Sequence, residues 1–338
     1  FFYVLDRETG ELISAEKFGT VTWASHVDLE TGRPVETAVS DYSEQPRFIQ
    51  PGPSGAHNWH PMAFSPLTGL VYIPLRTSGM IYALTQDFQP VTQTWSTGID
   101  WTGVDEAYRE LEVSADEGHL RAWDPVAQKE VWTVKHPGVA NGGVLATAGN
   151  LIFQGTADGR LLAFSADDGD LLWEVETRVG VIAPPVSFEI GGVQYISVLA
   201  GWGGNAMFGV DRGVSPAYEY ENEGRLLTFR LGGDQEIPEP PRKPVREGGA
   251  EDVSASSGDA TRGYELYSIH CWQCHGSEAV AGAITPDLRS SSKDVYDSFE
   301  GIVLGGALSQ NGMPAFSDVL DADDVEDIRA YVIHRARQ

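Results

Sequence analysis

Residues 118–124 (GHLRAWD) and 159–165 (GRLLAFS) are two copies of one pattern, each followed by a tryptophan at the same distance. The glycines that open the copies are 41 residues apart, and so are Trp132 and Trp173. A period of about 40–45 residues is typical of four-stranded propeller blades. Each copy has the pattern of a β-hairpin, with a strand, a polar turn and a second strand. The repeat therefore predicts a β body built from blades.

The start of the chain carries a third copy, because residues 4–10 (VLDRETG) match residues 163–169 (AFSADDG). An alanine, a glycine six residues on and a tryptophan four residues later resemble the tryptophan-docking motif of eight-bladed quinoprotein propellers. Residues 163–173 carry it whole, whereas Gln128 and Ser14 replace its glycine and its tryptophan in the other copies. Such a tryptophan can bury its ring against the next blade. An ordinary β-sandwich core is the alternative, but three copies in register favour the propeller.

Further apolar strands are predicted between and after these copies, and together they account for roughly half of an eight-bladed ring at about 40–45 residues per blade. They are residues 63–65, 70–74, 80–84, 144–153, 185–190, 195–199 and 226–231. Residues 28–55 have little periodicity and several glycines and prolines, so we expect a long loop there. The predicted fold is about half of an eight-bladed quinoprotein propeller, followed by an all-α domain.

Composition excludes several classes of function. The 338 residues include 23 basic and 49 acidic side chains, a net charge of −26 that argues against a nucleic-acid partner. No apolar run approaches the roughly 18 residues needed to cross a bilayer, so we expect a protein that does not span a membrane. Only two cysteines are present, which excludes a disulfide framework.

The pattern changes after the β body. Residues 234–258 are rich in proline and then in glycine and serine, which is typical of a linker that is first semi-rigid and then flexible. Asp259 is placed to cap a helix, and the acidic residues from Asp321 to Asp324 begin a last amphipathic helix. We expect a β-propeller part at 1–233, a linker at 234–258 and an all-α domain at 259–338. A domain of about 80 residues usually needs a staple such as a cofactor.

Residues 271–275 (CWQCH) are the most specific signal in the chain. In a Cys-x-x-Cys-His run, the thiols of Cys271 and Cys274 can add to haem vinyl groups while His275 places an imidazole on the iron. A redox dithiol would need a βαβ context, and a zinc site would need two more ligands. Neither is present in the sequence, so the motif predicts haem c.

The sixth iron ligand is expected in the loop before the last helix. Met313 lies there in a Gly-Met-Pro context, 42 residues after Cys271, and a methionine thioether is a common axial ligand in cytochromes c. The other candidates are Met62, Met80, Met207 and His334. Pro286 resembles the proline of class I cytochromes c whose carbonyl accepts the ring N–H of the iron-bound histidine, a bond that fixes the imidazole.

A propeller of this type joined by a proline-rich linker to a cytochrome c resembles the quinohaemoprotein alcohol dehydrogenases, which are periplasmic enzymes that use pyrroloquinoline quinone (PQQ) and Ca²⁺. The resemblance is especially close in residues 1–14, 55–59 (GAHNW), 183–185 and 199–204 (LAGWGG). It implies that Asn58 and Trp59 contact PQQ. The amide of Asn58 could reach quinone or carboxylate oxygens, and Trp59 could offer a flat wall. More weakly, it implies that Trp202 and Gly203 lie in a loop over the quinone.

The resemblance also implies what this sequence does not carry. The family's adjacent cysteines, calcium ligands, catalytic aspartate and quinone-pairing lysine map upstream of Phe1. Because the chain opens inside an apolar strand, we expect a fragment or a processed chain that is inactive by itself. The implied function is oxidation of an alcohol, with electrons leaving through haem c to a small acceptor protein or a quinone. The alternatives are a PQQ dehydrogenase for another hydroxylated substrate and a non-catalytic electron-transfer module on a propeller scaffold.

Overall fold

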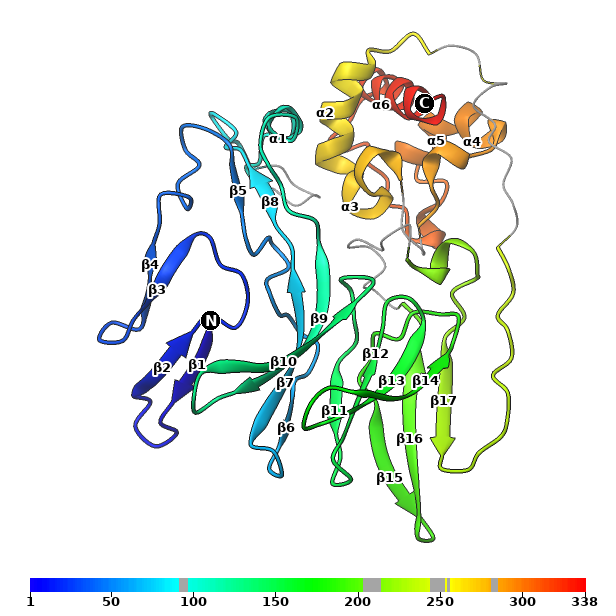
Figure 1. Ribbon diagram of the computed structural model, residues 1–338. Coiled ribbons are helices and arrows are strands. Elements are labelled where there is room, and N and C mark those ends of the chain that lie inside the picture. Colours follow the sequence, from blue (N-terminus) through cyan, green and yellow to red (C-terminus); the bar gives the residue numbers. More distant parts are fainter. Residues whose placement is uncertain (91–96, 203–213, 244–252, 254–255, 281–284) are drawn as a thin grey trace. The chain divides into compact units, whose positions relative to one another are not determined.

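The computed structural model describes residues 1–90, 97–202, 214–243, 253, 256–280 and 285–338 (Figure 1). The described chain divides into two compact units. The first comprises residues 1–84, 103–202 and 214–242. The second comprises residues 85–90, 97–102 and the described residues from 243 onward.

The first unit is built from antiparallel strands. They are β1 (Phe2–Leu5), β2 (Leu12–Glu16), β3 (Ala24–Asp28), β4 (Arg33–Glu36), β5 (Arg47–Ile49), β6 (Ala63–Ser65), β7 (Leu70–Thr77), β8 (Met80–Tyr82), β9 (Glu117–Asp124), β10 (Lys129–His136), β11 (Val144–Ala146), β12 (Leu151–Gly155), β13 (Arg160–Ser165), β14 (Leu171–Glu176), β15 (Val186–Ile190), β16 (Val193–Ala200) and β17 (Arg225–Arg230). Two sheets have four strands, in the orders β10-β9-β7-β6 and β11-β12-β13-β14, and a third has the order β15-β16-β17. Strand pairs β1-β2, β3-β4 and β5-β8 complete the unit. These sheets confirm the strand-rich body that the repeat predicts.

The sequence repeat corresponds to equivalent hairpins in the two four-stranded sheets. Strands β9 and β10 form one hairpin, and β13 and β14 form the other (Figure 1). In each, the tryptophan of the second strand pairs with the alanine of the first: Trp132 with Ala122, and Trp173 with Ala163. A register irregularity lies beside this pair in both hairpins. The 41-residue period therefore reflects one structural unit used twice.

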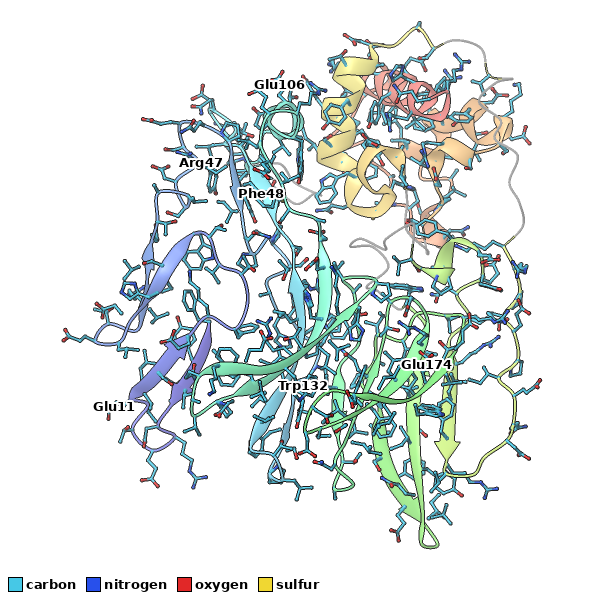
Figure 2. The ribbon with its side chains drawn as sticks, viewed as in Figure 1. Glu11, Arg47, Phe48, Glu106, Trp132 and Glu174 are labelled. Carbon is cyan, nitrogen blue, oxygen red and sulfur yellow. The ribbon has the colours of Figure 1, made fainter. Side chains whose placement is uncertain are left out.

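Trp132 has the docking role expected of the repeat tryptophan (Figure 2), whereas Trp173, in the copy that carries the whole motif, is 40 % exposed. The Trp132 ring is buried, and its Nε1 donates a hydrogen bond of 3.2 Å to the carbonyl of Ala166 in the neighbouring sheet's β13–β14 turn. Gly169, in the same turn, has φ +78°, and a Cβ there would lie 2.7 Å from the indole. The tryptophan and the glycine of adjacent repeats thus fit together and join the two sheets.

Three features of this unit differ from the sequence expectation. Residues 144–153, predicted as one strand, form β11 and β12 around a turn in which Asn150 has φ +60°. The stretch 28–55, predicted as a loop, contains β4, which pairs with β3, and β5, which pairs with β8. A short helix α1 (Trp101–Ala107) was not expected. Pairing partners distant in sequence override the weak local signal in such stretches.

Part of the segment expected to be a linker is held against the residues that precede β17. Tyr220 forms an isolated β-bridge with Arg242, and the Glu221 N–H donates 2.8 Å to the carbonyl of Pro241. The Arg242 guanidinium lies 4.8 Å from the centre of the Tyr220 ring and donates to its hydroxyl over 2.8 Å. Residues 241 and 242 therefore continue the first unit rather than hang free.

The second unit is helical. Its helices are α2 (Ala260–His270), α3 (Trp272–His275), α4 (Lys293–Asp297), α5 (Phe299–Val303) and α6 (Ala322–Ala336). Asp259 caps α2 by accepting from the Thr261 N–H over 2.8 Å, and Asp321 and Asp324 form a reciprocal capping box at the start of α6. Both predicted helix starts are confirmed.

Helices α2 and α6 cross in close contact at Gly263. A Cβ on this residue would lie 1.9 Å from the carbonyl oxygen of Asp327 in α6. The aromatic rings of Tyr267 and Tyr331 meet beside the crossing at 5.1 Å, and both residues are buried. The absence of a side chain at Gly263 is what lets the two backbones approach.

We expect Gly263→Ala to destabilise the helical unit by about 1–3 kcal/mol, the usual cost of overpacking a close contact, despite the higher helix propensity of alanine. Thermal unfolding followed by circular dichroism measures the effect. Gly301→Ala in α5 is the matched control, because a Cβ there meets nothing within 4 Å. Equal stability of the two variants would contradict the close crossing.

Candidate functional site

The CWQCH motif lies at the junction of α2 and α3. Cys271 ends α2, and its N–H donates to the Tyr267 carbonyl over 2.8 Å, while α3 carries the remaining residues of the motif. Both cysteines are free thiols; Cys271 is buried and Cys274 is exposed. Burial raises the pKa of the Cys271 thiol to about 12. The helical turn places both thiols and the histidine within five residues, as covalent haem attachment requires.

His275 is held in an apolar setting. Its side chain is buried, and burial lowers the pKa of its imidazole below the usual value, which favours the neutral form that binds iron. The carbonyl oxygen of Pro286 lies 3.4 Å from Nδ1. If Nδ1–H donates to this carbonyl, Nε2 is the nitrogen left for a metal.

Met313 follows a tight turn before α6. Gly312 adopts a left-handed conformation with φ +92°, and the Met313 N–H donates to the Leu308 carbonyl over 3.3 Å. The Met313 side chain is partly buried and packs against the core of the helical unit. His334, by contrast, is exposed on α6, and its Nε2 lies 2.8 Å from the side-chain amide of Gln338.

Of the other candidate methionines, two lie in the first unit and one is not described. Met62 and Met80 lie in the first unit, and Met207 is outside the described residues. Met313 is thus the methionine that the second unit contains among its described residues.

Two aromatic contacts at the motif were not expected from the sequence. The Tyr267 hydroxyl donates 2.7 Å to the carbonyl of Gly276, which directly follows His275. The indole of Trp101, which groups with the second unit, packs against Trp272 with ring centres 4.9 Å apart. Trp272 lies between the two cysteines, so Trp101 adds apolar cover beside the motif. No local sequence pattern marks Trp101, because it is about 170 residues from the motif along the chain.

The Asn-Trp pair lies in the segment that leads into the edge strand β6. The Asn58 side chain is used locally: its Nδ2 donates 3.0 Å to the Ser54 carbonyl, and its Oδ1 accepts 2.8 Å from the Trp59 N–H. The indole of Trp59 is 60 % exposed. The amide of Asn58 therefore shapes the turn, and the open ring of Trp59 is the surface that a ligand can meet.

Trp202 is placed differently from Trp59. It is 1 % exposed, and a Cβ on Gly180 would lie 2.5 Å from its ring, so the indole is buried against that backbone. Its backbone N–H donates 2.9 Å to the side-chain oxygen of Asn222, whereas its indole Nε1 is buried and has no hydrogen-bond partner among the described residues. Gly203 lies outside the described residues.

The residues around the Trp59 segment fit a flat, polar ligand such as PQQ. Trp59 offers an open aromatic face, and the neighbouring His60 has a buried Nε2 with no hydrogen-bond partner among the described residues. Close backbone contacts hold the segment in place: the Val144 N–H donates 2.9 Å to the Pro61 carbonyl, and a Cβ on Gly143 would lie 2.5 Å from the Pro61 ring.

Within the described ranges, no group of three or more histidine, cysteine or acidic residues is arranged to hold a metal ion. No helix in the described part of the chain is long and apolar enough to cross a membrane.

Two family models match the chain. The glucose/ethanol/alcohol dehydrogenase β-propeller domain matches residues 100–196, and the cytochrome c oxidase cbb3-type subunit III model matches residues 258–332. The second match contains the CWQCH motif and Met313.

Curated proteins and solved structures agree with these matches. The chain is 44 % identical over 337 residues to quinohemoprotein alcohol dehydrogenase ADH IIB of Pseudomonas putida, covering 99 % of this chain and 48 % of that protein. It is 39 % identical over 337 residues to a quinohemoprotein alcohol dehydrogenase of Comamonas testosteroni, covering 98 % and 46 %. The solved structure of ADHIIG from Pseudomonas putida HK5 matches with a TM-score of 0.86 at 36 % identity, covering 99 % of this chain and 50 % of that one. The Comamonas testosteroni enzyme structure matches with a TM-score of 0.80 at 35 % identity, covering 99 % and 49 %.

The chain spans about half the length of the curated relatives it matches. The match is nevertheless continuous over both units, from the β-strands to the haem-type motif. Over nearly its full length, the chain is similar to the C-terminal half of quinohaemoprotein alcohol dehydrogenases.

Proposed function

We propose that this chain is the C-terminal part of an enzyme that oxidises alcohols to aldehydes with PQQ and passes the electrons through haem c. One observation carries the proposal: a blade-type β unit and a CWQCH-bearing helical unit occur in one chain, in the order of its relatives. In this proposal, the first unit is about half of an eight-bladed propeller. The functional parts are a propeller part at 1–233, a linker at 234–258 and a class I cytochrome c domain at 259–338.

In the second unit, we assign Cys271 and Cys274 to covalent haem attachment and His275 and Met313 to the iron. The buried, neutral imidazole of His275 and the partly buried thioether of Met313 are the two donors. The carbonyl of Pro286, 3.4 Å from Nδ1, orients the histidine. A thioether ligand stabilises ferrous iron, which favours acceptance of electrons.

In the first unit, we assign the Trp59 ring to the wall of the PQQ site. Bound PQQ would supply a hydride acceptor for the alcohol, and haem c would supply one-electron transfer onward. The exposed indole of Trp59 gives the quinone a flat apolar surface and keeps water from that face. Asn58 keeps Trp59 in its turn through the 2.8 Å bond to the Trp59 N–H. Trp202 and Gly203 stay a weaker assignment to the loop over the quinone.

We propose the metal ion, the location and the electron acceptor from the resemblance to the family. Ca²⁺ is expected to polarise the quinone oxygens, with ligands and catalytic base supplied by a part of the complete protein that maps upstream of Phe1. The expected location is the periplasm, and the expected acceptor is a small redox protein or a quinone. Which alcohol is oxidised depends on the residues that contact the substrate.

Dye reduction by the complete protein tests the proposal. Apoprotein is mixed with PQQ and Ca²⁺ and supplied with a panel of primary alcohols, with aldose sugars as a comparison. We expect dye reduction that needs both PQQ and an alcohol. Activity on sugars alone would indicate another hydroxylated substrate, and absence of PQQ binding would indicate an electron-transfer module.

Trp59→Ala is expected to weaken PQQ binding about tenfold, because loss of an aromatic stacking surface costs about 0.5–1.5 kcal/mol and 1.4 kcal/mol corresponds to a factor of ten. Equilibrium dialysis against PQQ measures the change. The haem spectrum should stay unchanged, since the CWQCH motif lies in the other unit. Trp173→Ala, at another exposed tryptophan of the first unit, is the control. An equal effect of both variants would contradict the assignment.

A further inference from the structure

The side chain of His60, the residue after Trp59, packs against one face of the Trp59 indole. The imidazole of His60 and the indole of Trp59 are stacked, with ring centres 4.0 Å apart and planes 23° apart. Their exposures are opposite: Trp59 is 60 % exposed and His60 is 2 % exposed. The indole therefore has one face covered by a buried ring and another face available to a ligand.

The His60 ring carries an unusual polar atom. Its Nε2 is buried and has no hydrogen-bond partner among the described residues. A buried polar group without a partner costs about 1–3 kcal/mol, so such atoms in folded proteins call for an explanation. Burial and the nearby Arg76 and His57 lower the pKa of His60 to about 4, so the ring is neutral at physiological pH. A neutral imidazole can stack on an indole without bringing a charge into the site.

Several other groups of the segment have partners. His57 Nδ1 lies 2.9 Å from the Pro74 carbonyl, and the Asn58 amide bonds to Ser54 and to the Trp59 N–H. The Pro61 carbonyl accepts from the Val144 N–H. Within this segment, Nε2 of His60 is a buried side-chain nitrogen that has no partner among the described residues.

We propose that His60 is a positioning residue of the quinone site: its ring holds the Trp59 indole in place, and its Nε2 gains a hydrogen bond when the cofactor binds. The inference rests on the proposed PQQ site and adds a residue to it. Because the His60 ring covers the face of the indole that a stacked cofactor does not occupy, the partner of Nε2 is a water that the bound cofactor orders. His60 acts through Trp59 and through this bond, and it has no role in the reaction step itself.

Two variants separate the stacking from the hydrogen bond. His60→Phe keeps a flat ring behind Trp59 but has no nitrogen, whereas His60→Ala removes both. PQQ affinity is measured in the complete protein by equilibrium dialysis, and near-ultraviolet circular dichroism reports the setting of the Trp59 indole. Neither readout needs turnover.

We expect His60→Ala to weaken PQQ binding by about tenfold or more and to change the aromatic dichroism, because both interactions are lost. His60→Phe should weaken binding by a smaller factor and preserve the aromatic signal. His136→Phe is the control. It removes another buried imidazole, which lies on β10, at the edge of the sheet opposite β6. Its Nε2 is already 2.9 Å from the Gln154 side chain. It should lower thermal stability without changing PQQ affinity.

The outcomes distinguish this inference from the function on which it rests. Wild-type affinity in His60→Ala, beside a loss in Trp59→Ala, would overturn the role of His60 and leave the PQQ site standing. Equal losses in His60→Phe and His60→Ala would overturn the stacking role, and wild-type affinity in His60→Phe would overturn the hydrogen bond. A wild-type protein without PQQ affinity would overturn the proposed function itself.

Discussion

Replacing Met313 by alanine is expected to abolish the near-infrared sulfur-to-iron charge-transfer band of the ferric protein completely. The structure places Met313 in a turn fixed by Gly312, with its side chain packed against the core of the helical unit. Alanine offers the iron no donor atom, so the band that reports an iron–sulfur bond cannot form. The reduction potential should fall as well, because the thioether favours ferrous iron.

Absorption spectroscopy and a potentiometric titration measure both effects. Met62→Ala is the matched control, since Met62 lies in the first unit and is 44 % exposed. It should leave the band and the potential unchanged. A normal band in Met313→Ala would show that another side chain ligates the iron and would exclude Met313.

The second large effect concerns haem attachment. Expressed with haem-attachment machinery, the wild-type protein should keep its haem through acid-acetone extraction, because thioether bonds to Cys271 and Cys274 are covalent. In the double variant that carries both Cys271→Ala and Cys274→Ala, any bound haem should be fully extractable. The helical unit should also lose stability, since a small domain relies strongly on a bound cofactor.

Pyridine haemochrome spectra of the extracted and protein-bound fractions give the measurement. His334→Ala, an exposed position on α6, serves as the control and should retain covalent haem. Extractable haem in the wild-type protein, or tightly bound zinc in its place, would contradict the assignment of the motif.

Local patterns with a fixed spacing predicted the fold best. The repeat predicted the β9–β10 and β13–β14 hairpins, and the docking of Trp132 on the neighbouring sheet followed from the same motif. The caps at Asp259 and Asp321 also followed from sequence, because a capping side chain acts within three residues of its own position.

Elements that depend on distant partners could not be predicted in this way. Strand β5 pairs with β8 about 30 residues later, and nothing in residues 47–49 alone signals that partner. The apolar run 144–153 resembles one strand because its composition does not reveal the turn at Asn150. Pairing across a sheet is decided by packing, which single-sequence patterns describe poorly.

The candidate site shows the same division. The cysteines and histidine of residues 271–275 form a contiguous motif, so the sequence alone predicted the haem-type site. Trp59 came from the family resemblance. His60 was missed because ring stacking and a buried nitrogen without a partner arise only in the folded chain. No sequence pattern signals either property.

The central claim is that electrons taken from an alcohol leave through the haem of this chain. Stopped-flow absorption tests it directly in the complete protein, loaded with PQQ and Ca²⁺ and mixed with a primary alcohol in the absence of any external acceptor. We expect the ferrous haem bands to appear with the alcohol and PQQ together, and neither alone to produce them. A haem that stays ferric while the same preparation reduces an added dye with that alcohol would contradict the account.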